Sequence, residues 1–385
     1  MLPTERFAPG SRLPPEERRL AALDGLRGIA ACIVLFHHVT WPSHITGLTF
    51  VTNGYIAVDL FFVLSGYIIS RKYMWAISGG AAALRFVCLR FFRLYPLHLF
   101  VLLLFVAFEV AKLVLIRAFG FAPGDSAPFT GTESIPLLIA NIFLLQSFNV
   151  SSFVSWNGPS WSISGEMFSY LVFLIVPLTG LLRMRWLAAV LALGALGTYV
   201  WVGYQSQYSN MTSEWGFVRA LAGFAAGVVI CLMEKRQEQP IADSVPWRLD
   251  AVVVGAILVL MAIVQGPWLY TVVGFAVVLV AMLRGDQGAV ANLLSLPLPQ
   301  LLGRLSYSIY LLHAFVAVFL TDLIRYLLPG EFAASVWFGD VLIVVFIVLT
   351  LAGSALTYRF VEMPGRQLGR AIANRMASPA KPLAT

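Results

Sequence analysis

Long apolar segments, each about as long as a helix that crosses a lipid bilayer, recur along almost the whole chain. A hydrocarbon core is crossed by roughly 20 apolar residues in a helix. Of the 385 residues, 59% are hydrophobic and only 12% are charged, which leaves too little polar surface for a water-soluble domain. The sequence therefore predicts an all-α, polytopic integral membrane protein.

Ten segments have the length and apolar character of a transmembrane helix, and we expect them to form one bundle. They lie near residues 22–41, 55–72, 91–116, 162–182, 186–203, 216–233, 249–265, 268–284, 305–327 and 338–360. The apolar segment Ile135–Phe148 has only about 14 residues, so we expect a short re-entrant or interfacial helix there. The predicted membrane domain is 22–362, between a cytoplasmic N-terminal segment (1–21) and a cytoplasmic C-terminal tail (363–385).

Lysine and arginine residues beside the predicted spans set the expected orientation. These residues favour short cytoplasmic loops, so the basic N-terminus and the basic segments "RKYM" and "LRFF" are predicted to lie inside. Both termini are then cytoplasmic. The same distribution explains the formal net charge of +7 without a nucleic-acid partner.

The first predicted span, "LDGLRGIAACIVLFHHV", carries ionisable residues that lipid tolerates poorly. Arg27 and His38 are 11 residues apart, which places them on one helix face and about 16 Å apart along the axis. An intramembrane arginine normally faces the protein interior or a watery cavity, so Arg27 either binds an anion or pairs with Asp24 or with a carboxylate of another helix. His37 points about 100° away from His38 and is the alternative functional histidine.

Two arginines stand at the start of the third predicted span, in "LRFFRLYPLHL". Arg90 and Arg93 are three residues apart and therefore share a helix face at the cytoplasmic boundary. They either mark the cytoplasmic side of the span or bind an anion there.

Polar residues also recur at helical spacing in later spans. In "WNGPSWSISGEMFSYL", Glu166 lies in an apolar turn and needs a partner. Trp161, near the outer interface, is either a membrane anchor or a surface on which a sugar stacks. Ser306 and His313 are seven residues apart in "LLGRLSYSIYLLHAF", which again places them nearly on one face.

Taken in order, these motifs resemble the membrane acyltransferase 3 family, also called the membrane-bound O-acyltransferases of bacterial polysaccharides. "LDGLRGIAACIVLFHH" is similar to the family's Arg-x10-His pattern, and "VDLFFVLSGYII" is similar to its second helix. "RFFR" resembles its Arg-x-x-Arg motif, "PSWSISGEMFSY" its Trp-Ser-Leu-Ser-x-Glu motif, and "GRLSYSIYLLH" and "YRFVEMP" its last two helices. The resemblance covers nearly the whole chain. Some relatives carry a fused serine-hydrolase-like domain, which we do not expect here.

The resemblance implies an O-acyltransferase of the bacterial inner membrane. It would transfer an acyl group, usually acetyl, from cytoplasmic acyl-CoA (acetyl-CoA) to a hydroxyl of an extracytoplasmic or membrane-associated carbohydrate or glycolipid. His38 is the expected general base. Glu166 is expected to orient the imidazole or assist proton transfer, and an ion pair of Glu166 with Arg304 or Arg27 is the alternative. The predicted substrate-binding residues are Arg27, Arg90 and Arg93 for the CoA phosphates, with Trp161, Ser306 and His313.

Acyl-CoA is expected as a co-substrate, with no permanently bound cofactor and no metal. Direct attack by the acceptor and transfer through an acyl-histidine are both chemically possible. The competing class is a transporter or flippase for a lipid-linked sugar, which also needs intramembrane charges, although no inverted repeat is evident in the sequence. The acceptor, the acyl length and the oligomeric state are left open.

Overall fold

The computed structural model of the chain describes residues 15–120, 127–181, 211–236, 289–327 and 334–377, with scattered positions between 186 and 201. All regular structure in these ranges is helical, as predicted, and they contain no strand. In chain order the helices are α1 (Pro15–His37), α2 (Thr49–Thr52), η2 (Gly54–Ile56), α3 (Ala57–Tyr73), α4 (Gly80–Phe119), η3 (Gly131–Glu133), α5 (Ile135–Ile142), η4 (Gly158–Ser160), α6 (Trp161–Phe173), α7 (Ile175–Leu178), α9 (Gly216–Arg236), α12 (Ala289–Leu294), α13 (Pro297–Leu327), α15 (Val336–Thr357), η6 (Tyr358–Glu362) and α16 (Met363–Ala377).

Six helical segments of the described structure are long and apolar enough to cross a membrane. They are Thr49–Tyr73, Gly80–Phe119, Gly158–Leu178, Gly216–Met233, Pro297–Arg325 and Val336–Met376, and each overlaps a predicted span. α1 corresponds to the first predicted span, and its 23 residues give it a length of about 35 Å. The predicted spans 249–265 and 268–284 and half of the positions in 186–203 lie outside the described residues, so the number of ten helices stays a prediction.

The short apolar segment Ile135–Phe148 contains α5, a helix of eight residues that is only about 12 Å long. The chain then turns at Leu144, whose φ of 57° lies in the left-handed region. The Tyr95 hydroxyl of α4 donates to the carbonyl of Ile142 at 3.1 Å, which ties the end of α5 to α4. α5 is therefore too short to cross the membrane, as the length of its segment indicates.

Glycines allow the central helices α3 and α9 to approach closely. A Cβ atom on Gly66 of α3 would lie 2.0 Å from the carbonyl oxygen of Phe224 in α9. A Cβ atom on Gly227 of α9 would lie 2.1 Å from the carbonyl oxygen of Val63 in α3. Close backbone contact at small residues is the usual way that helices pack within membranes. The α3–α9 pair, with α6 packed on α9, forms the wall on which much of the site is built.

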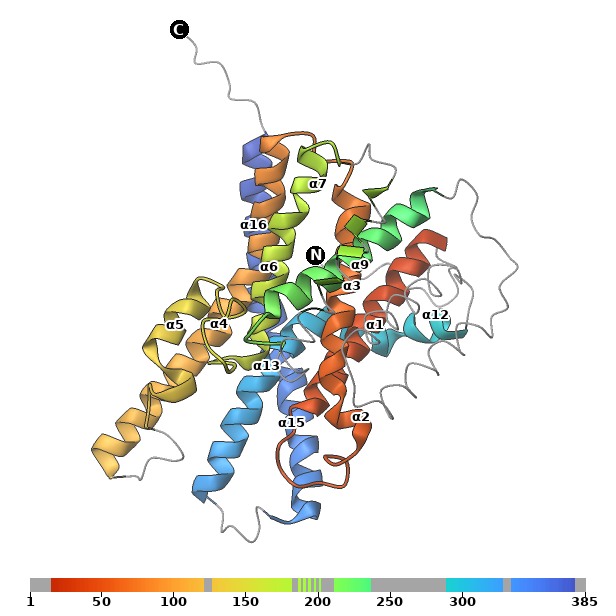
Figure 1. Cartoon of the computed structure of the whole chain (residues 1–385). Coiled ribbons are helices and arrows are strands. Elements are labelled where there is room, and N and C mark those ends of the chain that lie inside the picture. Colours follow the sequence, from red (N-terminus) through yellow and green to blue (C-terminus); the bar gives the residue numbers. More distant parts are fainter. Residues whose placement is uncertain are drawn as a thin grey trace.

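Two of the helices are longer than a bilayer requires. α4 has 40 residues and is about 60 Å long, roughly twice the thickness of a hydrocarbon core. α15 continues through the π-helical turn η6 into α16, and α16 packs along α4 (Figure 1). Residues 363–385, predicted as a cytoplasmic tail, thus begin as a helix that belongs to the bundle.

Candidate active site

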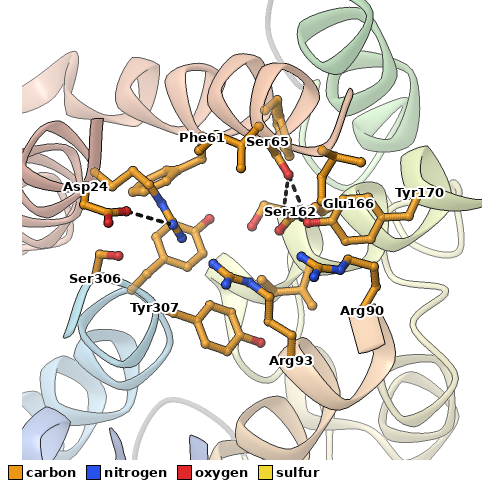
Figure 2. Close-up of a pocket in the computed structure, with 16 residues that line it drawn as sticks. Asp24, Phe61, Ser65, Arg90, Arg93, Ser162, Glu166, Tyr170, Ser306 and Tyr307 are labelled. Atoms are coloured by element: carbon orange, nitrogen blue, oxygen red, sulfur yellow. Dashed lines mark hydrogen bonds and ion pairs between the residues drawn. The ribbon is translucent and has the colours of Figure 1, made fainter. Parts of the chain in front are cut away.

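Five helices meet around a cavity of about 260 Å³, which we call the arginine cavity. Figure 2 shows Arg90 and Arg93 extending from α4 into the cavity, with Arg90 toward Glu166 and Tyr170 of α6. The polar residues that line it are Asp24 and Arg27 of α1, Ser65 of α3, Arg90 and Arg93 of α4, Ser162, Glu166 and Tyr170 of α6, and Ser306, Tyr307 and Tyr310 of α13. The arrangement concentrates three guanidinium groups in an enclosed space, which suits an anionic or strongly polarised ligand.

Two hydroxyl groups hold the carboxylate of Glu166 in this cavity. Its Oε1 accepts a hydrogen bond from Ser65 Oγ at 2.7 Å and another from the Tyr170 hydroxyl (Figure 2). The Arg27 guanidinium lies 3.8 Å from the carboxylate of Asp24, its neighbour one turn earlier. Glu166 is therefore oriented by hydroxyl donors, and Arg27 takes Asp24 as its nearest carboxylate partner among the described residues.

A second cavity, of about 570 Å³, lies where α1 ends, and we call it the histidine cavity. His37, His38, Trp161 and Arg219 are among the residues that line it. Tyr310 lines this cavity and the arginine cavity alike. The two cavities are therefore adjacent and share one lining residue.

Hydrogen bonds to backbone carbonyls fix the tautomers of two neighbouring histidines. His38 Nδ1 lies 2.9 Å from the carbonyl oxygen of Val34, and it must donate because a carbonyl only accepts. His313 Nδ1 donates to the carbonyl of Ile309 at 3.0 Å in the same way. The ring centroids of the two histidines are 4.7 Å apart. Each neutral imidazole thus keeps its Nε2 lone pair, and the buried Nε2 of His313 has no partner among the described residues.

A fully buried ion pair stands beside the histidine cavity. Arg219 of α9 donates to both carboxylate oxygens of Asp59 in α3, at 2.8 and 2.7 Å, and both side chains are 0% exposed. The Arg219 guanidinium also lies over the Trp161 ring, 5.1 Å from its centroid. Sequence analysis did not select Arg219. The sequence feature that could have identified it is the position of this arginine within an apolar span, away from the predicted cytoplasmic end. A charge at such a position is costly and needs a partner.

The predicted site residues fall into two neighbouring groups. The arginine cavity contains Arg27, Arg90, Arg93, Glu166 and Ser306; the histidine cavity contains His38 and Trp161, with His313 against His38. The structure does not pair Glu166 with His38, since the two side chains line different cavities. Arg304, the other proposed partner of Glu166, is exposed.

In the described part of the chain, no group of three or more His, Cys, Asp or Glu side chains is arranged to hold a metal ion.

A helical membrane bundle that encloses a histidine pair beside an arginine-lined cavity has the parts of a membrane-embedded group-transfer enzyme. The sequence model described as "Acyltransferase domain", that of the acyltransferase 3 family, matches residues 20–359. The chain belongs to this family, and it is a membrane-bound O-acyltransferase. This result favours the enzyme over the transporter that was the competing class.

Three relatives illustrate the similarity. BcsY of Komagataeibacter xylinus, provisionally named a membrane-bound transacylase, is 29% identical over 362 residues, which cover 91% of this chain and 84% of BcsY. The acyltransferase MdmB of Streptomyces mycarofaciens is 29% identical over 400 residues, covering 93% of this chain and 95% of MdmB. The O-acetyltransferase OatA of Staphylococcus aureus is 24% identical, covering 91% of this chain and 58% of OatA. No solved structure matches the chain.

Proposed function

We propose that this protein transfers an acyl group, most simply acetyl, from cytoplasmic acyl-CoA to a hydroxyl of an extracytoplasmic or membrane-associated carbohydrate or glycolipid. The observation that supports the proposal is that the arginine cavity and the histidine cavity adjoin each other. The arginine cavity suits the anionic donor, and the histidine cavity, which shares Tyr310 with it, holds a candidate base for the acceptor. The names of BcsY, a transacylase, and OatA, an O-acetyltransferase, agree with acyl transfer, and that of OatA with transfer to oxygen.

In the proposed reaction, His38 Nε2 removes the proton of the acceptor hydroxyl as its oxygen attacks the carbonyl carbon of the thioester. The C–O bond forms, the tetrahedral intermediate collapses with cleavage of the C–S bond, and the CoA thiolate takes the proton back from His38. The bond from His38 Nδ1 to Val34 holds the tautomer that this step needs. The Nε2 of His313, beside His38, is available to accept a hydrogen bond from another hydroxyl of the carbohydrate.

The proposal that the acceptor is a carbohydrate or glycolipid is tested by comparing cells with and without the gene. Mass spectrometry of their polysaccharides and glycolipids should show the loss of the acyl mass increment from one carbohydrate class when the gene is absent. Complementation by the wild-type gene should restore that increment. Unchanged acylation of every carbohydrate and lipid fraction would remove the support for a carbohydrate acceptor.

We predict that the loop between α3 and α4 faces the cytoplasm and that the loop before η3 faces the other side. Basic residues cluster at the α3–α4 end of the bundle, as the cytoplasmic bias of lysine and arginine requires. Ser78 and Thr130 are exposed positions in these two loops. In intact cells, a membrane-impermeant maleimide should label Thr130→Cys and leave Ser78→Cys unlabelled until the membrane is opened. The opposite labelling pattern would reverse the proposed topology.

We predict that the double variant Arg90→Lys/Arg93→Lys binds acyl-CoA more weakly than the wild type by roughly 1–3 kcal/mol. Lysine keeps the positive charge that topology uses but loses the planar fork that binds phosphate through two parallel hydrogen bonds. The measurement is acyl-CoA affinity of the purified protein in nanodiscs, with cysteine labelling to confirm unchanged topology. Wild-type affinity in this variant would show that the two arginines only mark the cytoplasmic side.

A further inference from the structure

A third cavity, of about 530 Å³, lies between the N-terminal part of α4 and the C-terminal helix α16, and we call it the basic cavity. Six cationic side chains line it and no carboxylate does: Lys72, Arg85, Arg90, Arg93, Arg366 and Arg370. Arg90 and Arg93 line the arginine cavity as well, so the basic cavity adjoins it. Three cavities thus follow one another, and the histidine cavity is the one farthest from the basic cavity.

Two glycines bring the arginines of α16 to this cavity. A Cβ atom on Gly369 would lie 2.4 Å from Phe92 Cβ of α4, and one on Gly365 would lie 2.8 Å from the Pro96 ring. Arg366 and Arg370 each follow one of these glycines and are one helical turn apart. The close contact that only glycine permits therefore places both guanidinium groups beside α4.

The charges of the basic cavity are only partly compensated. Arg366 Nη2 lies 2.5 Å from a carboxylate oxygen of Glu362, which balances one of the cations. Arg370, Arg93 and Lys72 form no ion pair with any residue that the structure describes. The preference of lysine and arginine for cytoplasmic loops explains why cations gather at this end of the bundle. It does not explain why the cationic side chains of α3, α4 and α16 line one concave surface. A hollow of this composition suits a ligand with several negative charges.

We propose that the basic cavity binds the phosphate-bearing nucleotide end of acyl-CoA, and that Arg370 with Arg85 binds the ribose 3′-phosphate. This inference rests on the proposed donor. Along α4, Arg85 stands about 12 Å before Arg93, so the cavity has an inner end at the arginine cavity and an outer end. Arg85 donates to Asn374 of α16 at 3.2 Å, which marks the outer end.

The order of groups in the donor fits these two ends. The pyrophosphate lies between the thiol-bearing arm and the nucleoside, whereas the 3′-phosphate lies on the ribose, farther from the thiol. When the thioester points toward His38, the pyrophosphate lies beside Arg90 and Arg93 at the inner end. The 3′-phosphate then lies toward the outer end, between Arg85 of α4 and Arg370, which stands one turn before Asn374 on α16.

The test compares the binding of CoA and 3′-dephospho-CoA to the protein in nanodiscs. The two probes share the thiol arm and the pyrophosphate, so the ratio of their affinities isolates the 3′-phosphate. We expect the wild type to prefer CoA by about tenfold or more, as a charged hydrogen bond to phosphate allows. Arg370→Gln should abolish most of this preference while leaving the affinity for 3′-dephospho-CoA nearly unchanged. Arg375→Gln is the matched control, because Arg375 is exposed on the same helix and does not line the cavity.

The outcomes separate this inference from the proposed donor. A wild type that binds both probes equally, or an Arg370→Gln variant that keeps the full preference, overturns the 3′-phosphate site and leaves the acyl-CoA proposal standing. A wild type that binds neither probe overturns both. An anionic lipid headgroup is the other source of phosphate, so the binding is repeated in nanodiscs with and without phosphatidylglycerol. If Arg370→Gln changes only the response to that lipid, the cavity is a lipid site and the inference fails.

Discussion

Replacing His38 by alanine is expected to reduce acyl transfer by about 10²-fold to 10⁴-fold, the usual contribution of a general base. The protein should remain folded and inserted, because His38 lies at the end of α1 and lines a cavity rather than filling the packed core. The measurement is the rate of acyl transfer from acyl-CoA in membranes that contain equal amounts of each variant.

His37→Ala is the matched control for this prediction. His37 is the neighbouring residue, lines the same cavity and donates through Nδ1 to the carbonyl of Val51 at 3.2 Å. That bond attaches the end of α1 to α2, so we assign His37 a structural role and expect most of the activity to remain. Loss of activity in His37→Ala with retention in His38→Ala would show that the other member of the doublet is the base.

Replacing Asp59 by alanine is expected to destabilise the protein by about 3–5 kcal/mol, as is usual when one partner of a buried ion pair is removed. Arg219, which is 0% exposed in the structure, would lose both hydrogen bonds to the carboxylate. The effect should appear as a lower unfolding temperature of the purified protein and a smaller yield of monodisperse protein in detergent.

Two variants serve as controls for the Asp59 prediction. Asp340 forms an ion pair with His44 at 2.5 Å, but both side chains are substantially exposed, so Asp340→Ala should have a much smaller effect. The double variant Asp59→Leu/Arg219→Met removes both charges and should recover part of the lost stability. An Asp59→Ala protein as stable as the wild type would mean that the pair contributes nothing to the fold.

Much of the fold follows from the sequence because membrane helices are specified locally. Segment length and apolarity predicted a span near 55–72, where α3 lies, and one near 338–360, where α15 lies. The 100° rotation per residue also predicted that Arg90 and Arg93 share a face, and both line the same two cavities. These predictions needed only the residues within one helix.

The partnerships between helices were beyond the reach of such reasoning. Helical spacing says which face a residue occupies but not which helix that face meets. The pairing of Asp59 with Arg219 joins positions 160 residues apart, and it depends on the glycine contacts between α3 and α9. For the same reason, Glu166 was expected beside His38, whereas the described structure gives it Ser65 and Tyr170 as partners.

The π-helical turn η6 sets the angular phase between α15 and α16. A π turn holds about one more residue than an α-helical turn, so every side chain after it is rotated by roughly 100° from the position that a continuous α-helix would give it. Glu362, at the end of the turn, is buried and accepts a hydrogen bond from Ser308 of α13 at 2.8 Å, which fixes the turn against the bundle. The 41-residue segment Val336–Met376 thus contains two helices whose side-chain faces are offset by this rotation. Without this turn, the arginines of α16 that line the basic cavity would point roughly 100° away from it.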